Sequence, residues 1–419
     1  MQLRVVKTFI SRFLILILSF GLVIYSTNMW GSEGKGTISL VIANVAMVSF
    51  FSSILAGSST SFFAKKFKTE ELLGFAYLWS ILIGILVPLL FTITSFQTEY
   101  LFHLMGISVF SSLLSANINL FVGTQNIKLF NIYTVLQQLL HIVFILILVY
   151  FANQTHVETY FIAQIACCIL LFISSTWHIV KVSKVSKLVF SKNVFKNMFD
   201  YGWKTQLSAF VQFLNYRLSF YFLDYFEGVA AVGIFSIGIT FSEAIWTITR
   251  SMAVILYSDV VNSKSEQESI SKTKESLKIA VLLMIICAFF ILIIPSQLYV
   301  LIFGQEFSNT KTIMLLLLPG IIMIAITDMI GYYFSAIKQL RILNIKAFVG
   351  LFFTVLLSYL LIPKWGIVGA CIATTASYCI SAGILIWKFY QKTPFRLKDY
   401  TYTLAEIKAL KNSFTKRDL

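Results

Sequence analysis

The stretch VSKVSKLVFSKNVFKNMFDY, residues 182–201, is the longest basic break in a chain that is otherwise a series of apolar segments. About six apolar segments of roughly 20 residues lie on each side of it. An α-helix of that length can cross a hydrocarbon core of about 30 Å. The break therefore predicts an all-α integral membrane protein with two six-helix lobes, as in many transporters built from repeats.

About twelve transmembrane helices follow from the apolar segments. Their approximate spans are residues 10–28, 37–57, 72–95, 100–123, 130–151, 158–180, 205–223, 229–257, 279–302, 312–336, 345–362 and 367–388. We expect an N-lobe over residues 1–190, a C-lobe over 191–390 and a basic cytoplasmic tail over 391–419. In that tail, apolar residues from Leu404 to Phe414 are spaced three or four apart, which fits either an interfacial amphipathic helix or a solvated tail.

Basic residues are distributed very unevenly between the two ends of these spans. Nearly all of the 33 Lys and Arg residues fall in breaks that lie on the same side of the membrane as the N-terminus. The breaks on the other side of the membrane hold only Lys35, Lys311 and Lys364. Such an excess marks cytoplasmic loops, so both termini are expected to be cytoplasmic. The net charge of +15 then reflects lysines that face anionic membrane lipid, and no nucleic acid partner is needed to explain it.

Composition excludes several classes of protein. The chain is 58% hydrophobic and 12% charged, with a mean hydropathy of +0.84, which excludes a soluble globular domain. The outward breaks are too short for a catalytic domain, which argues against a membrane-embedded transferase or polymerase. No phosphate-binding P-loop motif is present, so ATP hydrolysis is not expected. The five cysteines lie within spans and lack metal-ligand spacing, which favours a packing role without metal.

Four charged residues fall inside the apolar spans, and they are Arg217, Arg250, Glu243 and Asp328. A charge near the bilayer centre costs at least about 2.5 to 3.5 kcal/mol, so such residues usually face a bundle interior or a wet cavity. Arg217 lies roughly 20 Å from the inner end of its span, too deep to extend its head group to the cytoplasm. It either faces a substrate cavity or forms a structural ion pair with a neighbouring helix.

Each of the other three charged residues also has two possible roles. Arg250 either binds a ligand or extends its side chain to the inner interface. Glu243 lies seven residues before it on the same helical face, about 10 Å away along the helix, so the two cannot touch directly. Glu243 and Asp328 are candidates to carry a coupling proton or sodium ion, and pairing with a basic residue is the alternative for both.

The first half of the chain has uncharged polar residues inside its spans. Amide and imidazole groups suit sugar hydroxyls, although hydrogen bonds between helices are the commoner explanation. The candidate sugar contacts are Asn117, Asn119, Gln125, Gln137, Gln138 and His141. Residues that break helices predict hinges at Pro88 in the third span and at Pro319 and Gly320 in the tenth.

Three motifs spread over the chain point to a known family. They are Gly31-Ser-Glu-Gly-Lys-Gly36, Leu301-Ile-Phe-Gly-Gln-Glu-Phe307 followed by Leu318-Pro-Gly320, and Ile362-Pro-Lys-Trp-Gly-Ile-Val-Gly-Ala370. In their order and spacing they resemble the Wzx-type polysaccharide flippases of the multidrug/oligosaccharidyl-lipid/polysaccharide (MOP) exporter superfamily.

The resemblance implies a MATE-like, two-lobed transporter rather than an enzyme. Proteins of this family flip oligosaccharides linked to undecaprenyl pyrophosphate, such as O-antigen repeat units, to the outer leaflet of the bacterial plasma membrane. It also implies ion-coupled alternating access with H⁺ or Na⁺ and no other cofactor. A polysaccharide polymerase and a chain-length regulator of the same pathway are expected partners.

In similar proteins a cationic cavity accepts the pyrophosphate, and Arg217 matches the position of a cavity arginine. Arg250 and Lys204 are further candidates for pyrophosphate contacts, and Glu243 or Asp328 would reset the carrier. The first half departs from the family pattern because it supplies few intramembrane cations. A drug exporter of the same superfamily is the main rival, and it would favour acids over Arg217 in its cavity.

Overall fold

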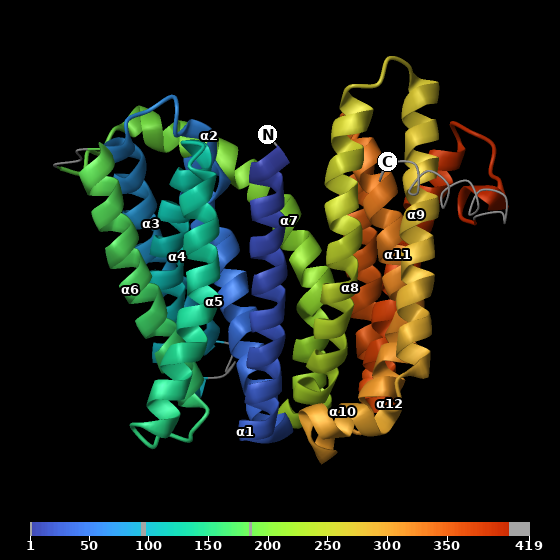
Figure 1. The fold of residues 1–419 in the computed structure, drawn as a ribbon, viewed down its shortest axis with the longest axis horizontal. Coiled ribbons are helices and arrows are strands. Elements are labelled where there is room, and N and C mark those ends of the chain that lie inside the picture. The colour runs from blue at the N-terminus through green and yellow to red at the C-terminus, as the bar shows by residue number, and fades with distance from the viewer. Residues whose placement is uncertain (1, 94–97, 184–186, 402–419) are drawn as a thin grey trace, which may run out of the picture. The chain divides into compact units, whose positions relative to one another are not determined.

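The computed structural model describes residues 2–93, 98–183 and 187–401, and within these ranges the chain forms helices and turns but no strand (Figure 1). The helices are α1 (Gln2–Ala56), α2 (Ser58–Phe63), α3 (Thr69–Ile93), α4 (Leu101–Gly123), α5 (Ile127–Tyr150), α6 (Glu158–Ser183), α7 (Lys192–Glu227), α8 (Val229–Val261), α9 (Glu266–Ile293), α10 (Ser296–Phe303), α11 (Thr310–Ala336) and α12 (Leu340–Tyr390). Short 3-10 turns are η1 (Thr98–Tyr100), η2 (Gln305–Phe307) and η3 (Leu397–Asp399). The predicted all-α class is confirmed.

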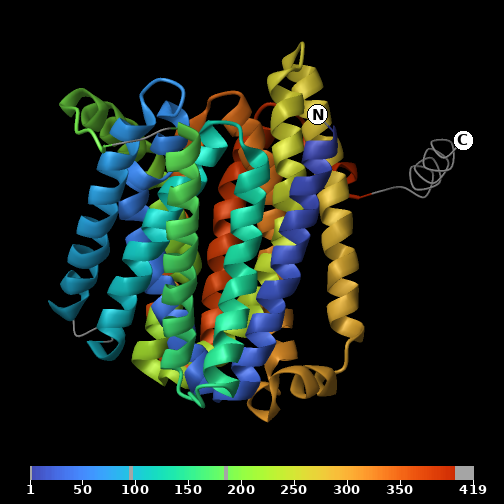
Figure 2. The ribbon, with the colours of Figure 1, turned by 60° about the vertical axis from the view of Figure 1, so that its left-hand side comes forward.

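Nine helices in the described part of the chain are long and apolar enough to cross a membrane. The set contains α1, α3 to α6, α8, α9, α11 and α12, whereas α2 and α10 are too short and α7 is more polar. Figures 1 and 2 show α10 lying across the ends of the neighbouring long helices α9 and α11. The chain is thus a multi-pass membrane protein, while the number of crossings and the cytoplasmic location of the termini stay predictions.

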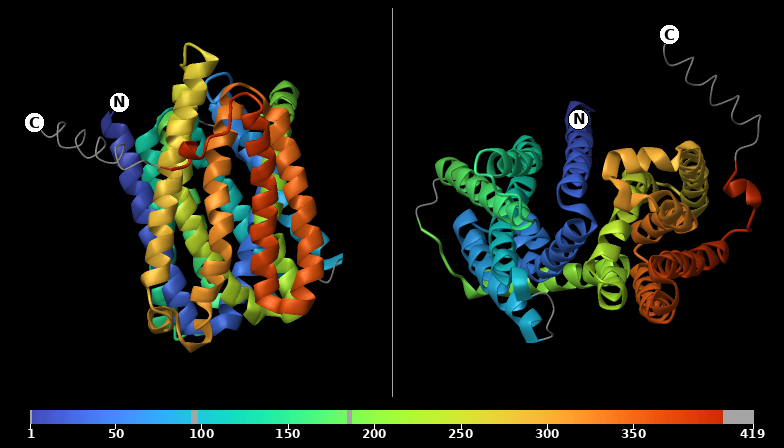
Figure 3. Two further views of the ribbon diagram at one scale, coloured as in Figure 1. Left: turned by 90° about the vertical axis from the view of Figure 1, so that its right-hand side faces the viewer. Right: turned by 90° about the horizontal axis from the view of Figure 1, so that it is seen from below.

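Two of these nine helices are each broken at one glycine. Gly31 in α1 has φ 63° and Gly366 in α12 has φ 52°, a region of backbone conformation that residues with a Cβ atom rarely adopt. A straight helix of 51 residues, the length of α12, would extend about 77 Å, far more than a bilayer core. The two halves of α12 instead lie side by side (Figure 3), and Thr354 Oγ1 is 2.7 Å from Ser377 Oγ.

The chain divides into two compact units, which we call unit 1, up to Phe213, and unit 2, from Leu214 onward. Each unit has its own apolar core. In unit 1 the core includes Cys167 and Cys168, which are buried thiols that form no disulfide, and in unit 2 it includes Tyr333. The division falls inside α7, so the lobe boundary expected between residues 190 and 191 stays a prediction.

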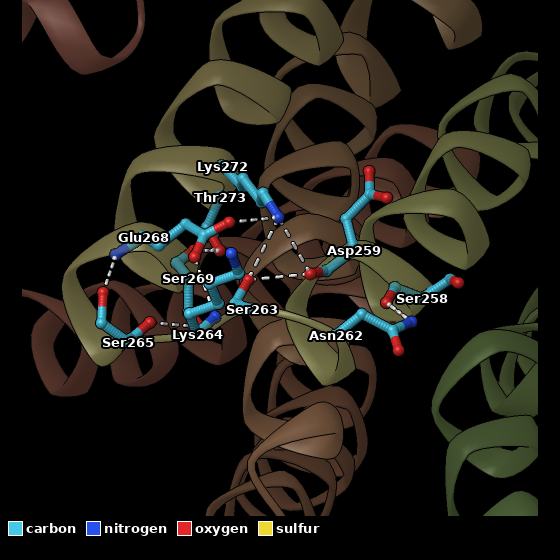
Figure 4. Close-up of polar contacts among 10 residues, drawn as sticks. All are labelled: Ser258, Asp259, Asn262, Ser263, Lys264, Ser265, Glu268, Ser269, Lys272 and Thr273. Carbon is cyan, nitrogen blue, oxygen red and sulfur yellow. Dashed lines mark hydrogen bonds and ion pairs between the residues drawn. The ribbon is translucent and has the colours of Figure 1, made fainter.

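The turn between α8 and α9 is fixed by a group of polar contacts (Figure 4). The Ser265 side chain caps α9 by accepting from the Glu268 backbone N–H at 3.2 Å, and the Glu268 carboxylate accepts from the Lys264 backbone N–H at 2.8 Å. The first contact satisfies an N–H group that has no partner inside the helix, and the second ties the residue before the N-cap to the first turn. Lys272 pairs with Glu268 at 2.8 Å and reaches back to the Asp259 carbonyl of α8. The two helices are therefore joined rigidly at this end.

The chain that follows α12 folds back onto the start of α9. Lys392 pairs with Glu266 at 2.6 Å, and that hydrogen bond raises the pKa of the Lys392 ammonium group. Asp399 pairs with Lys274 at 2.9 Å and accepts from the Tyr390 hydroxyl. The first eleven residues of the predicted tail are thus held against unit 2, and the predicted interfacial helix around Leu404 to Phe414 lies outside the described residues.

Candidate functional site

The four charged residues found inside apolar spans form two arginine–acid pairs in unit 2. Arg217 of α7 donates from Nη2 to Glu243 Oε1 of α8 at 2.5 Å. Arg250 of α8 lies with Nε 4.0 Å from Asp328 Oδ2 of α11. Each pair joins two helices, which is the ion-pair alternative weighed for these residues. Their role in binding a substrate stays a prediction.

The periodicity of α8 explains why its two charges have different partners. Glu243 and Arg250 are seven residues apart, which places them on the same face but two turns apart. This separation leaves room for two partners, and Glu243 contacts α7 whereas Arg250 contacts α11. Close packing of α8 on α11 is possible because Gly238 lies against Ile313, where a Cβ atom would overlap the isoleucine side chain. Six residues after Glu243, Thr249 approaches Asp328 Oδ2 to 3.4 Å and adds a second contact between α8 and α11.

The guanidinium group of Arg250 is bounded by aromatic rings. Its Cζ atom lies 5.1 Å from the ring centroid of Trp246 and 5.7 Å from that of Tyr216. The Tyr216 hydroxyl accepts from Nη2 at 3.4 Å, and Tyr378 packs edge-on against Tyr216. Cation–π contacts of this kind orient a guanidinium without neutralising its charge.

The two arginines differ in how far their charge is compensated. The Arg217 side chain is 25% exposed and directly hydrogen-bonded to a carboxylate. The Arg250 side chain is 43% exposed, and at 4.0 Å its contact with Asp328 is longer than a hydrogen bond. The charge of Arg250 is therefore more exposed and less directly compensated than that of Arg217.

Lys346 is a site residue that the sequence interpretation missed. It is one of the many basic residues that the charge distribution places on the cytoplasmic side, and it lies in the second turn of α12, where it interacts electrostatically with Asp328 and Arg250. Its position within the predicted span 345–362 was the available signal. With Lys346 the cluster contains three cations and two acids, which leaves one positive charge in excess.

An uncharged network holds the second half of α7 against both halves of α12. Asn215 Oδ1 lies 2.6 Å from Thr354 Oγ1 and 3.1 Å from Ser377 Oγ. One turn later, Ser219 Oγ lies 3.1 Å from Thr374 Oγ1 and 3.4 Å from Ser358 Oγ. Hydrogen bonds between transmembrane helices fix their register. They fix the position of Tyr216 and Arg217, which lie between these two contacts on α7.

The candidate sugar contacts do not gather at one place in unit 1. Asn117 is fully buried, donates to Ser175 and Thr176, and accepts from the Tyr77 hydroxyl. Asn119 donates to the Ser115 carbonyl at 2.9 Å. These amides join helices to one another or to their own turn.

The other candidates of the first half lie on α5 or in the turn before it. His141 is buried, with Nε2 3.1 Å from the Tyr160 carbonyl. Gln125 is exposed in the turn after α4, and Gln137 and Gln138 are partly exposed on α5. Lys204 forms an exposed ion pair with Asp200, one turn away on the α7 segment of unit 1, and does not join the charged cluster.

The hinge candidates Pro88 and Pro319 lie inside helices that continue through them, and Gly320 packs against Thr375 of α12. A hinge motion at these positions stays a prediction. Within the ranges 2–93, 98–183 and 187–401, no group of three or more His, Cys, Asp or Glu residues could hold a metal ion.

Asn117→Ala is expected to lower the free energy of unfolding by roughly 1 to 3 kcal/mol, because it leaves buried hydroxyl partners unsatisfied. Thermal unfolding of the detergent-solubilised protein measures this change, with the exposed Asn197→Ala as the matched control. Transport per folded molecule should be unchanged. If the variant loses transport but keeps wild-type stability, Asn117 binds sugar instead.

Comparison with solved structures identifies the architecture. The inward-facing form of a multidrug resistance MATE transporter of the MOP superfamily aligns with a TM-score of 0.73 and 14% identity, covering 91% of this chain and 96% of the other. The inward closed form of the lipid II flippase MurJ aligns with a TM-score of 0.73 and 16% identity, covering 95% and 89%.

The chain has the MOP-superfamily fold. This confirms the predicted MATE-like architecture. No model of a protein family matches the sequence of this MOP-fold protein.

Two curated relatives of this MOP-fold protein are similar in sequence. A probable low-salt glycan biosynthesis flippase of Haloferax volcanii is 24% identical over 223 residues, which cover 50% of this chain and 45% of the relative. The capsular polysaccharide biosynthesis protein CapF of Staphylococcus aureus is 24% identical over 296 residues, covering 68% and 73%. The match thus spans less than half the length of the first relative. Where the names of these relatives and neighbours state an activity, it is that of a flippase or a transporter.

Proposed function

We propose that this protein is a flippase that moves a lipid-linked oligosaccharide across the membrane. The observation that carries the proposal is the cluster of Arg217, Arg250 and Lys346 with two acids, on helices of a MOP fold. A net positive charge inside apolar helices is costly, and an anionic substrate supplies the compensating charge. Relatives named for glycan and capsular polysaccharide biosynthesis support an oligosaccharide cargo.

The substrate we propose is an undecaprenyl-pyrophosphate-linked repeat unit of O-antigen or another surface polysaccharide. The planar guanidinium groups of Arg250 and Arg217 offer paired N–H donors, which match phosphate oxygens in a bidentate way. Arg250 makes the first contact with the diphosphate, because it is more exposed and more weakly paired than Arg217. The bacterial plasma membrane is the proposed location, and the polymerase and chain-length regulator of the same pathway are the proposed partners.

Transport is proposed to be alternating access coupled to H⁺ or Na⁺. Glu243 and Asp328 are the candidate groups for the coupling ion, because each lies beside an arginine that the substrate would engage. Pro88, Pro319 and Gly320 are the candidate hinge positions. Binding of the coupling ion to a carboxylate would return the empty carrier to its starting state.

A multidrug exporter is the second candidate, since a multidrug resistance MATE transporter is among the structural neighbours. Export of organic cations requires accessible acids. In this structure Asp328 is only 13% exposed and Glu243 is paired with Arg217, which favours an anionic substrate.

The proposal is tested with purified protein in proteoliposomes that contain a fluorescent undecaprenyl-diphosphate oligosaccharide. We expect flipping between leaflets to be faster than in empty liposomes, and Arg217→Ala to slow it about tenfold, because a charge-assisted contact is lost. Arg396→Ala removes an exposed cation outside the cluster and should retain the full rate.

Imposed proton or sodium gradients identify the coupling ion. Flipping no faster than in empty liposomes, together with ethidium transport that survives Arg217→Ala, would support the drug exporter instead.

A further inference from the structure

The anion that Arg217 holds in this structure belongs to the protein itself. Glu243 Oε1 accepts from Arg217 Nη2 at 2.5 Å, and the ring of Phe220 lies 5.1 Å from the guanidinium carbon. The pair is also accessible, since the side chains are 25% and 35% exposed. A ligand can therefore approach the same N–H groups that Glu243 occupies.

The second acid of the cluster is held differently. Asp328 is only 13% exposed, lies 4.0 Å from Arg250, and also has Thr249 and Lys346 within its reach. Its charge is thus shared among several groups, whereas Glu243 makes a short contact with one arginine. The two acids are suited to different tasks: Asp328 balances the cluster, and Glu243 occupies one binding group.

We propose that Glu243 is a built-in anion that competes with the diphosphate of the substrate for Arg217. The inference rests on the proposed function, because it takes the substrate to be a lipid diphosphate. The diphosphate engages Arg250 first and then displaces the Glu243 carboxylate from the Arg217 guanidinium group. The carboxylate is released only when substrate is bound.

The energetics favour such an exchange. A largely buried arginine without a counter-ion is unfavourable, so the empty carrier needs a counter-ion for Arg217. A guanidinium group accepts carboxylate and phosphate in the same bidentate geometry, and one can replace the other without rearrangement of the arginine. The diphosphate carries more charge than a carboxylate and has several contacts in the cluster, so it displaces Glu243.

Affinity for geranylgeranyl diphosphate, a short polyprenyl diphosphate without sugar, tests the competition in the detergent-solubilised full chain. Glu243→Gln should bind the probe about tenfold more tightly than the unsubstituted protein, because a charge-assisted hydrogen bond no longer has to be broken. Glu268→Gln removes the same charge at the exposed α8–α9 turn and should leave the affinity unchanged. In an Arg217→Ala background, Glu243→Gln should give no gain.

The outcomes separate this inference from the proposed function. Equal or weaker binding by Glu243→Gln overturns the competition, while the proposed function stands if the unsubstituted protein binds the probe and Arg250→Ala does not. If the unsubstituted protein does not bind the probe, both fail.

A measurement on the unsubstituted protein covers the case in which Glu243→Gln does not fold. Modification of Glu243 by a hydrophobic carbodiimide, followed by mass spectrometry, should increase when the probe is added, because the carboxylate has lost its arginine. Unchanged or reduced modification would contradict the exchange.

Discussion

Arg250→Ala is expected to lower the initial rate of lipid-diphosphate flipping roughly 100-fold, the largest functional effect of any single substitution in the cluster. The side chain is 43% exposed, is held over the rings of Trp246 and Tyr216, and lies 4.0 Å from its acid. It is thus oriented while much of its charge remains uncompensated. Removing a group that directly pairs with a desolvated phosphate costs about 2 to 5 kcal/mol.

The charge-conserving substitution refines this test. Arg250→Lys should still lose about tenfold in rate, because an ammonium group lacks the planar donors and stacks less well on Trp246 and Tyr216. The rate is measured by quenching of a fluorescent lipid-linked oligosaccharide in proteoliposomes, normalised to folded protein, with the exposed Arg396→Ala as control. A wild-type rate for Arg250→Ala at equal protein content would remove Arg250 from the binding site.

Asp328→Asn is expected to cause the largest loss of stability, about 3 kcal/mol, the lower end of the range found when one partner of a buried ion pair is removed, because Arg250 is partly exposed. Asp328 is 13% exposed and interacts electrostatically with both Arg250 and Lys346. Without it, two like charges face each other on α8 and α12 with no acid between them. Thermal unfolding followed by intrinsic tryptophan fluorescence in detergent measures the effect.

A second substitution tests the physical reason for that loss. Neutralising the facing cation, in the double variant Asp328→Asn with Lys346→Gln, should recover a large part of the lost stability, because the repulsion is removed. Asp259→Asn is the matched control, since Asp259 is exposed at the α8–α9 turn. If Asp328→Asn unfolds at the wild-type temperature, or Lys346→Gln fails to rescue it, the electrostatic coupling of the two helices is contradicted.

Sequence periodicity and charge predicted the helices well because hydrophobicity is a property of each segment. The spans 345–362 and 367–388 were separated at the position where Gly366 breaks α12, and 10–28 and 37–57 lie on either side of Gly31 in α1. A polar or glycine-containing gap between two apolar stretches marks such a reversal without any knowledge of the packing. The short helix α10 was assigned in part to the span 279–302, because an apolar helix of eight residues has the same local composition as the end of a long one.

The sequence predicted most of the charged residues that form the site, but it did not predict how they pair. Arg217, Arg250, Glu243 and Asp328 stand out because apolar segments normally exclude charge. Lys346 did not, because a lysine near the end of a span is indistinguishable from a topogenic loop residue when only its neighbours in sequence are known. The buried amide Asn117 looked like a sugar contact for a similar reason, since its helix partners Ser175 and Thr176 are almost sixty residues away in the chain.

The sequence by itself thus determined that the chain is an all-α membrane protein and which charges lie inside its helices, because both follow from the local cost of placing each side chain in an apolar medium. Only the tertiary structure decided that Arg217 pairs with Glu243, that Arg250 faces Asp328, and that Lys346 joins them. Pairing depends on which helices pack side by side and on their rotation, and those are set by contacts between distant segments. The uneven compensation of the two arginines, on which the proposed exchange depends, is a property of that packing.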